Sequence, residues 1–245
     1  MKRMLAGVAC AAFAGSSVLF AQVSPPAPAA PVLSAEAANI EAEVDEGLKK
    51  LGLDPADVKY VVVSHGHVDH AGGAKFLQDK YGARLVMSAA DYDLMERNTP
   101  TWRPKRDMIA TDGMALTLGD FTMTLYLTPG HTDGTISTVF PVRDGDRRHL
   151  VATWGGTSFN FGPIRARLLS YAQQADRFRA LTAQAGADVI LSNHPGLDGT
   201  HARVAALRTR TPGDPHPFVV GNGVMQRYLT AVGQCAQAAL EIVSA

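Results

Sequence analysis

The stretch VVVSHGHVDHAGG, residues 61–73, decides how this chain is interpreted. Its core, HGHVDH, holds three of the chain's eight histidines and one aspartate. His65 and His67 are two residues apart, so in an extended turn their rings point the same way. Asp69 and His70 follow where the chain turns into a helix, so they can face a second point nearby. Imidazole nitrogens and carboxylate oxygens are ligands that zinc prefers, and the cluster therefore predicts a metal site rather than a surface group of histidines.

Two further histidines are expected to follow strands, as this cluster does. The apolar run Tyr60 to Val63 predicts a strand buried on both faces that leads directly into the cluster. In FTMTLYLT, residues 121–128, apolar residues alternate with polar ones, which predicts a strand with one buried and one polar face before the loop that holds His131. The segment ADVILSNH predicts a strand that ends on His194. Three strands would thus deliver histidine-bearing loops.

The remaining elements are predicted from periodicity and from the positions of glycine and proline. Further strands are expected over residues 84–87 and in a hairpin formed by residues 135–142 and 149–154. Helices are expected from Ser34 to Leu51, after Gly73 to Tyr81, and over residues 89–97, 168–185, 201–210 and 224–243.

The chain's composition and its first residues bear on its location and partners. A formal net charge of zero over 245 residues predicts no nucleic-acid partner. Residues 1–21 have a basic start and an apolar run, which is typical of a signal peptide for export to the periplasm or the medium. Residues 22–35 form a linker rich in proline and alanine, and residues 36–245 are expected to form the functional domain. No later segment is apolar enough to span a bilayer, so no membrane association is expected after cleavage.

The motif HGHVDH, followed by PGHT and then by a strand-end SNHP, resembles the HxHxDH pattern of the metallo-β-lactamase superfamily of hydrolases. The resemblance extends from about Leu48 to the end of the chain and implies a four-layer αββα sandwich, an α/β fold. It also implies two zinc ions, one bound by His65, His67 and His131 and the other by Asp69, His70 and His194. The other three histidines, at positions 149, 201 and 216, match no part of the pattern.

The absence of a metal-bridging carboxylate limits which members of the superfamily the chain resembles. Glyoxalase II and the acyl-homoserine lactonases of this superfamily carry a metal-bridging aspartate between the third and the last histidine, whereas VATWGGTSFNFG, residues 151–162, holds no carboxylate and no cysteine. Six His/Asp ligands without a bridge resemble the third subclass of β-lactamases, which makes β-lactams the leading substrate class. Residues around Trp102 and in WGGTSFNF are candidates for the walls of a substrate pocket.

The N-terminal half departs from the family pattern. Members normally begin with a meander of strands, but between Ala21 and the helix before Tyr60 this chain has only the linker and VLSAEAAN. The sandwich is therefore expected to lack its N-terminal strands, and the exposed sheet edge could drive self-association.

The expected function is hydrolysis of a cyclic amide or ester in a small-molecule substrate. Two zincs would activate a shared water, and Asp69, the catalytic residue, would orient it as well as bind metal. The alternatives are a lactonase or thioesterase that uses the same dizinc site, or a truncated zinc-binding protein with little catalysis.

Overall fold

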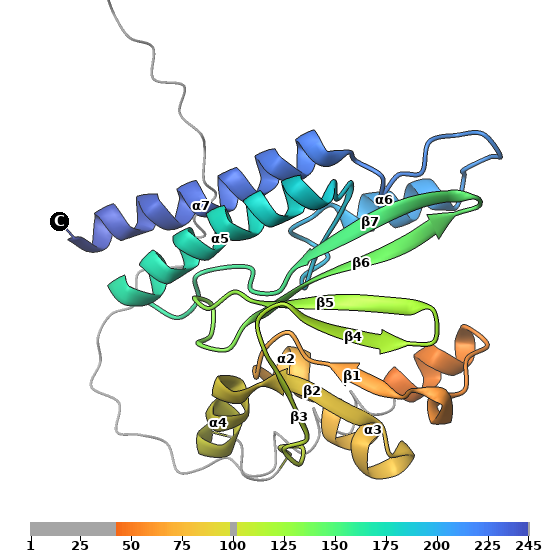
Figure 1. The fold of residues 1–245 in the computed structure, drawn as a ribbon, viewed down its shortest axis with the longest axis horizontal. Helices are drawn as coiled ribbons and strands as arrows, with labels where there is room; N and C mark the ends of the chain where they lie inside the picture. Colours follow the sequence, from red (N-terminus) through yellow and green to blue (C-terminus); the bar gives the residue numbers. More distant parts are fainter. Residues whose placement is uncertain (1–42, 99–101, 245) are drawn as a thin grey trace, which may run out of the picture.

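The structure, a computed structural model, describes residues 43–98 and 102–244. They form two β-sheets packed face to face, with helices on both outer faces (Figure 1). The predicted αββα sandwich is therefore confirmed. The predicted signal peptide, the linker and the first part of the helix expected from Ser34 lie outside the described residues, and the rest of that helix is seen over residues 43–50.

The first sheet is parallel and has the strand order β1-β2-β3 in the described part of the chain. Its strands are β1 (Tyr60–Val62), β2 (Arg84–Ser88) and β3 (Met108–Ala110). Parallel neighbours need crossover connections, and here α2 (Val68–Ala71) and α3 (Ala74–Tyr81) join β1 to β2, while α4 (Ala89–Asn98) leads from β2 toward β3. Within the described residues β1 pairs with β2 alone, so its outer edge has no strand beside it.

The second sheet is mixed and has the order β4-β5-β6-β7-β8. Its strands are β4 (Met114–Leu118), β5 (Phe121–Leu127), β6 (Ile136–Asp144), β7 (Arg147–Trp154) and β8 (Val189–Ser192). The first four are antiparallel neighbours, and β6 and β7 form the predicted hairpin. The last strand, β8, runs parallel to β7 because α5 (Arg165–Ala185) carries the chain back across the sheet.

Apolar side chains fill the space between the two sheets. Val86 of β2, Leu125 of β5 and Ile136 of β6 are at most 1% exposed and belong to one cluster. Leu85 and Met87, on the opposite face of β2, pack instead among residues of α2, α3 and α4. The alternation of β2 thus divides its side chains between two cores, each of which gains about 1.5–3 kcal/mol from a fully buried aliphatic residue.

The outer face of the second sheet is covered by α5 and α7 (Asn222–Ser244) (Figure 1). Trp154 of β7 and Phe178 of α5 are both 1% exposed in the cluster between them. Tyr126 packs against this cluster as well, so the face of β5 that the sequence predicts to be polar is in fact partly covered by the helices.

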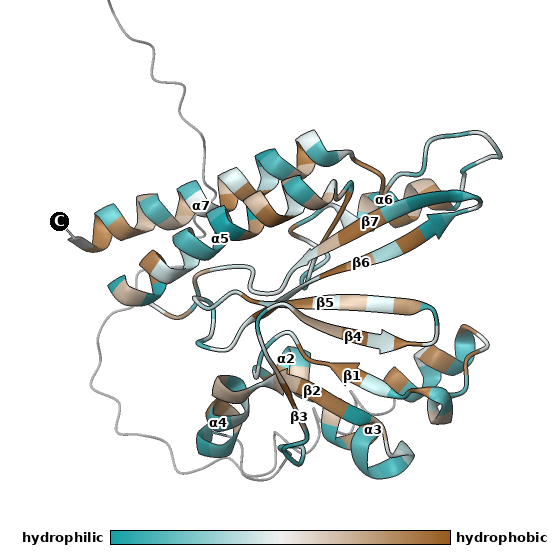
Figure 2. Ribbon diagram, in the orientation of Figure 1, coloured by the Kyte–Doolittle hydropathy of each residue, from teal (hydrophilic) through white to brown (hydrophobic). Residues whose placement is uncertain are grey.

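The two long helices also pack against each other. A Cβ atom placed on Gly233 of α7 would lie 3.5 Å from Ala175 Cβ of α5, so small residues let the two helices approach closely. Hydrophilic and hydrophobic residues alternate along both helices (Figure 2), as expected for helices with one face on the core. The remaining elements are a short 3₁₀ turn, η1 (Pro55–Asp57), and α6 (Thr200–Leu207). None of the helices in the described residues is long and apolar enough to cross a membrane.

Candidate metal centre

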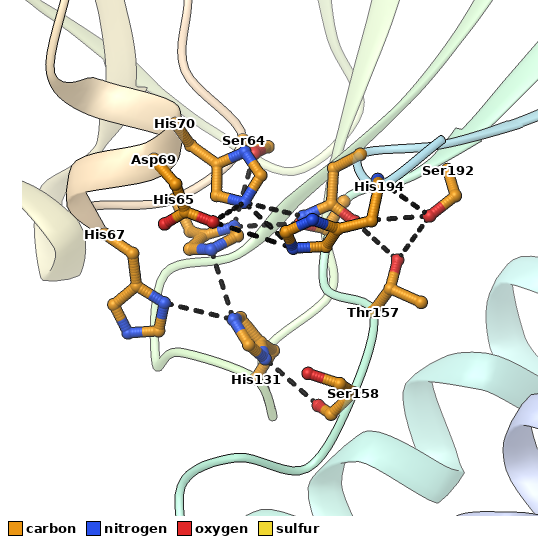
Figure 3. A network of polar contacts seen from close by, with 12 residues as sticks. Ser64, His65, His67, Asp69, His70, His131, Thr157, Ser158, Ser192 and His194 are labelled. Carbon is orange, nitrogen blue, oxygen red and sulfur yellow. Dashed lines mark hydrogen bonds and ion pairs between the residues drawn. The ribbon is translucent and has the colours of Figure 1, made fainter. Parts of the chain in front are cut away.

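Three segments at the ends of strands bring the predicted ligands together. His65 and His67 follow β1, and Asp69 and His70 lie in α2, which begins directly after His67. His131 lies in the loop between β5 and β6, and His194 follows β8 (Figure 3). These are the six predicted ligands, and the structure places them in two neighbouring groups of three: His65, His67 and His131, then Asp69, His70 and His194.

In the first group, one nitrogen of each ring points at the same spot. His131 Nε2 lies 3.1 Å from His65 Nε2 and 3.1 Å from His67 Nδ1. Zinc bonds to imidazole are about 2.0–2.1 Å long, so tetrahedral coordination separates two ligand nitrogens by about 3.3 Å. The spacing of these three nitrogens therefore fits a zinc ion.

Backbone carbonyls fix the protonation of two of these rings. His65 Nδ1 lies 2.9 Å from the carbonyl oxygen of Gly155, and His131 Nδ1 lies 3.1 Å from that of Ser158. A carbonyl oxygen only accepts, so each Nδ1 carries the proton and donates it. Both Nε2 atoms then hold lone pairs that face each other, an arrangement that a cation between them would stabilise.

Burial keeps these histidines uncharged. It lowers the pKa of His65 to about 2, with further lowering from the nearby His70, His131 and His67 rings. It also lowers the pKa of His131 to about 4. Both rings are thus neutral imidazoles at pH 7, which is the form that binds a metal.

The second group lies beside the first and is more open to solvent. His70 Nε2 lies 3.1 Å from Asp69 Oδ2 and 3.3 Å from His194 Nε2, and His194 Nε2 is 3.7 Å from Asp69 Oδ2. The Asp69 side chain is 54% exposed. The His65 and His70 ring centroids are 4.2 Å apart, so the two groups adjoin. A carboxylate and two imidazoles are again a donor set that suits zinc.

The segment WGGTS, residues 154–158, supports both groups. Besides supplying the two carbonyls, it holds Thr157, whose Oγ1 lies 2.7 Å from Ser192 Oγ. Ser192 Oγ accepts a hydrogen bond from His194 N at 3.1 Å, so the last ligand is linked to this segment (Figure 3). Ser158 has a φ of 91°, a conformation unfavourable for a residue with a side chain, and such strain is often found at functional sites.

The packing of the same segment leaves no room for a side chain at residue 156. A Cβ atom on Gly156 would lie 2.6 Å from His131 Cβ, a distance at which one of them must move. Residue 156 therefore packs directly against the third histidine as a glycine, and a side chain there would displace that ligand.

Asp91 of α4 is a residue of the site that sequence reasoning missed. It is fully buried, and one of its oxygens accepts hydrogen bonds from Gly66 N and from Thr132 Oγ1, at 3.2 and 2.8 Å. Burial raises the pKa of Asp91 to about 6. Its segment, SAADYDLMER, contains three acidic residues, and nothing in the pattern distinguishes the buried one.

Of the residues around Trp102 that were expected near a substrate pocket, residues 99–101 lie outside the described residues, and Trp102 itself is buried. It is 7% exposed and packs in the core between the first sheet and its helices, because its ring fills the space beside Tyr92 and Met95. The three histidines outside the pattern also lie outside both groups. His149 pairs with Asp188 at 2.6 Å, and His201 is exposed on α6.

A small cavity of about 100 Å³ borders the first group of ligands. It lies between α4, the His131 loop and the start of α5, and it is lined by His67, Ala90, Asp91, Leu94, Arg97, Thr132, Asp133 and Arg167. Arg167 donates from Nε to the carbonyl of Gly130 at 3.0 Å and stacks on the ring of Phe161 at 4.1 Å. Burial lowers the pKa of Arg167, while the carboxylates of Asp133 and Asp91, which line the same cavity, act to raise it.

Comparison with known proteins points in one direction. A family model described as "Metallo-beta-lactamase superfamily" matches residues 31–146. The hydroxyacylglutathione hydrolase of Acidiphilium cryptum is 30% identical over 135 residues, which are 55% of this chain and 49% of that protein. The N-acyl homoserine lactonase AttM of Agrobacterium fabrum is 34% identical over 122 residues, 43% of this chain and 44% of that protein. The matched segments thus span less than half the length of these curated relatives.

Solved structures share the fold over most of its extent. BJP-1 of Bradyrhizobium japonicum, a subclass B3 metallo-β-lactamase, superposes with a TM-score of 0.72 and 25% identity over 84% of this chain and 81% of its own. FEZ-1 of Legionella gormanii superposes with a TM-score of 0.72 and 21% identity over 85% of this chain and 83% of its own. The chain thus matches the metallo-β-lactamase superfamily over the segment that holds the HxHxDH motif, and it shares the αββα fold of solved metallo-β-lactamases, with two ligand groups on that sandwich.

Proposed function

We propose that the protein is a dizinc hydrolase that opens a cyclic amide or ester, with β-lactams as the leading substrate class. The observation that carries this proposal is the pair of adjoining three-ligand groups, His65, His67 and His131 beside Asp69, His70 and His194. Each group would hold one zinc and leave a coordination position open for water or substrate.

Zinc bound in such sites lowers the pKa of a coordinated water to about 7 and polarises a carbonyl oxygen. The protein's own residues orient the metal ligands and the attacking water. The neutral rings of His65 and His131 stay oriented because their Nδ1–H groups donate hydrogen bonds to the carbonyl oxygens of Gly155 and Ser158. Asp69 is exposed toward solvent, unlike the buried His65, so its carboxylate can orient an incoming water as well as bind metal.

The cavity beside His67 supports a substrate that carries a carboxylate. Among the described residues the guanidinium of Arg167 donates only from Nε, to Gly130, which leaves its two terminal nitrogens for a ligand. Arg167 also lies in the first turn of α5, where the helix dipole disfavours a cation and favours an anion. β-Lactams and glutathione thioesters carry such a carboxylate, whereas acyl-homoserine lactones do not.

A turnover panel with penicillin, carbapenem, lactone and thioester substrates would test the substrate class, with zinc content measured on the same sample. We expect close to two zincs per chain and the highest kcat/KM for a β-lactam. Arg167→Met should raise KM for a penicillin but not for its methyl ester. Preferred lactone or thioester turnover would favour the alternative hydrolase activities, which the AttM and hydroxyacylglutathione hydrolase matches suggest. Zinc without turnover would indicate a zinc-binding protein with little catalysis.

The metal assignment has a direct test in His67→Ala. This change removes one of three ligands from the first group, so it should empty that site and nearly abolish hydrolysis. His201→Ala, an exposed histidine on α6, is the matched control and should retain two zincs and full activity. Full activity in His67→Ala would refute the assignment.

We further propose that residues 1–21 are a signal peptide, that residues 22–35 are a linker and that the mature domain works in the periplasm or the medium. The basic start and the apolar run of the sequence support this. Mass spectrometry of the protein recovered from an expressing bacterium tests it, and an uncleaved N-terminus would contradict it.

A further inference from the structure

The fully buried carboxylate of Asp91 joins the two loops that supply the first group of ligands. Asp91 Oδ2 accepts from the backbone N–H of Gly66, the residue between His65 and His67. The same oxygen accepts from the hydroxyl of Thr132, which follows His131. One loop follows the first sheet and the other belongs to the second sheet, so a single oxygen atom links the two halves of the sandwich at the site.

The surroundings of Asp91 are shaped around it. A Cβ atom on Gly134 would lie 2.8 Å from Asp91 Cγ and 1.9 Å from Ser88 Oγ. A Cβ atom on Gly66 would lie 3.2 Å from the Asp91 carbonyl oxygen. Ser88 Oγ in turn accepts from Asp91 N at 3.2 Å, which fixes the start of α4. Glycine at residue 134 lets its loop approach the carboxylate this closely, and glycine at residue 66 avoids a tight contact with the backbone of Asp91.

A buried carboxylate is a costly way to join two loops. Asp91 forms no ion pair among the described residues, although Arg167 lines the same cavity, and its other oxygen, Oδ1, has no hydrogen-bond partner there. Burying a carboxylate without a paired cation opposes folding. In the first group all three ligands are imidazoles, which as metal ligands are neutral, so they would not offset the charge of a bound dication. The negative charge of the Asp91 carboxylate, behind the ligand loops, would offset part of it.

We propose that Asp91 is a positioning residue for the first metal site: its carboxylate holds the His65–His67 loop and the His131 loop at the spacing that one zinc ion requires. This inference rests on the proposed dizinc site. It assigns Asp91 no contact with substrate or metal, because the carboxylate acts through Gly66 and Thr132.

The test compares Asp91→Ala, Asp91→Asn and Thr132→Val in the full chain, with Asp93→Asn on the same helix as the matched control. Zinc affinity at each site is measured by competition with a chelator, and the cobalt-loaded protein is measured by absorption in the visible range. We expect Asp91→Ala to weaken the first site by about 10–100-fold, the range typical for residues that orient metal ligands, and to alter its cobalt spectrum. Asp91→Asn keeps an acceptor oxygen but loses the charge, so its effect should be smaller.

Thr132→Val covers the case in which Asp91→Ala does not fold. It removes one of the two donors to Asp91 without changing the size of the residue, and it should weaken the first site by about tenfold. If Asp91 had only a structural role, the variants would unfold at a lower temperature but keep the zinc affinity and the cobalt spectrum of the wild type. This outcome in Thr132→Val or Asp91→Ala would overturn the proposal. Wild-type protein that binds neither zinc nor cobalt would instead refute the proposed dizinc function itself.

Discussion

At the scale of single residues, the carboxylate of Asp69 stands apart from the other five ligands because it is the one charged group among them. Asp69→Asn keeps the size and removes the charge, so it should weaken the second metal site and misplace the water that attacks the substrate. We expect kcat to fall much more than KM changes. Steady-state kinetics at saturating zinc measure both, and a change confined to KM would show that Asp69 does not orient the nucleophile.

The protonation of the buried histidines predicts how the stability of the metal-free protein depends on pH. The folded-state pKa values of His65 and His131, about 2 and about 4, lie below the ordinary value of 6.5, so below pH 6.5 the folded chain binds fewer protons than the unfolded chain. Their contribution to stability is complete above pH 6.5 and is lost as the pH falls. Asp91, whose pKa is raised to about 6, contributes in the opposite sense but is a single group.

We therefore expect the free energy of unfolding of the chelator-treated protein to fall by about 1 kcal/mol or more per pH unit below 6.5. Urea unfolding between pH 7.5 and 4.5 measures this slope. His131→Gln, which lacks one of the two buried rings, should show a shallower slope. A midpoint that does not change over this range would contradict the assignment of neutral, buried imidazoles.

At the scale of elements, Gly155, directly after β7, affects both the packing of the neighbouring strands and the geometry of the metal ligands. A Cβ atom on Gly155 would lie 1.7 Å from the carbonyl oxygen of Ile136 in the neighbouring strand. The Ile136 N–H donates to Ser64 O at 2.7 Å, just before His65, so movement there would reach the first group of ligands. Gly155 itself accepts from His65 Nδ1.

Gly155→Ala should thus separate the ends of β6 and β7, lower the free energy of unfolding by about 2–3 kcal/mol and weaken zinc binding. Thermal melts with and without chelator, and chelator competition, measure the two effects. Gly196→Ala is the matched control, since nothing lies within 4 Å of a Cβ atom there, and it should leave both quantities unchanged. Wild-type stability in Gly155→Ala would mean that the strands can separate freely at this point.

The elements also show how far the sequence could predict the fold. Periodicity located β2, α4, α5 and the β6–β7 hairpin to within a few residues, because each has strong apolar spacing and clear ends. It gave no reason to expect β3, which is three residues long. The six predicted ligands lie in three short motifs, HGHVDH, PGHT and SNHP, that the sequence makes visible. Asp91 does not, because its role depends on which face of α4 packs against the two loops, and that is decided by tertiary contacts.

At the scale of the whole molecule, the outer edge of β1 is the most unusual feature of the sandwich. Tyr60 and Val62 pack toward the second sheet and Val61 toward the helices, so β1 is apolar on both faces, yet it has one strand beside it in the described residues. An edge of this kind presents unpaired N–H and C=O groups to another chain.

We therefore expect the zinc-loaded mature protein to self-associate, to melt at a low temperature, or both. Light scattering over a dilution series measures the first property and a thermal melt the second. A monomer that melts well above about 60 °C, the upper range for ordinary mesophilic domains, would show that the edge needs no further strand.

The contact between Gly156 and His131 also constrains how this protein could evolve. Glycine becomes aspartate by a single nucleotide change, so a chain of this type can readily sample a carboxylate at residue 156. With a Cβ atom 2.6 Å from His131 Cβ, however, such a variant would displace a ligand before its carboxylate could serve as one. The bridged and unbridged forms of the site would then be separated by an intermediate of low fitness. A lineage could cross between them only after another substitution had first shifted the His131 loop.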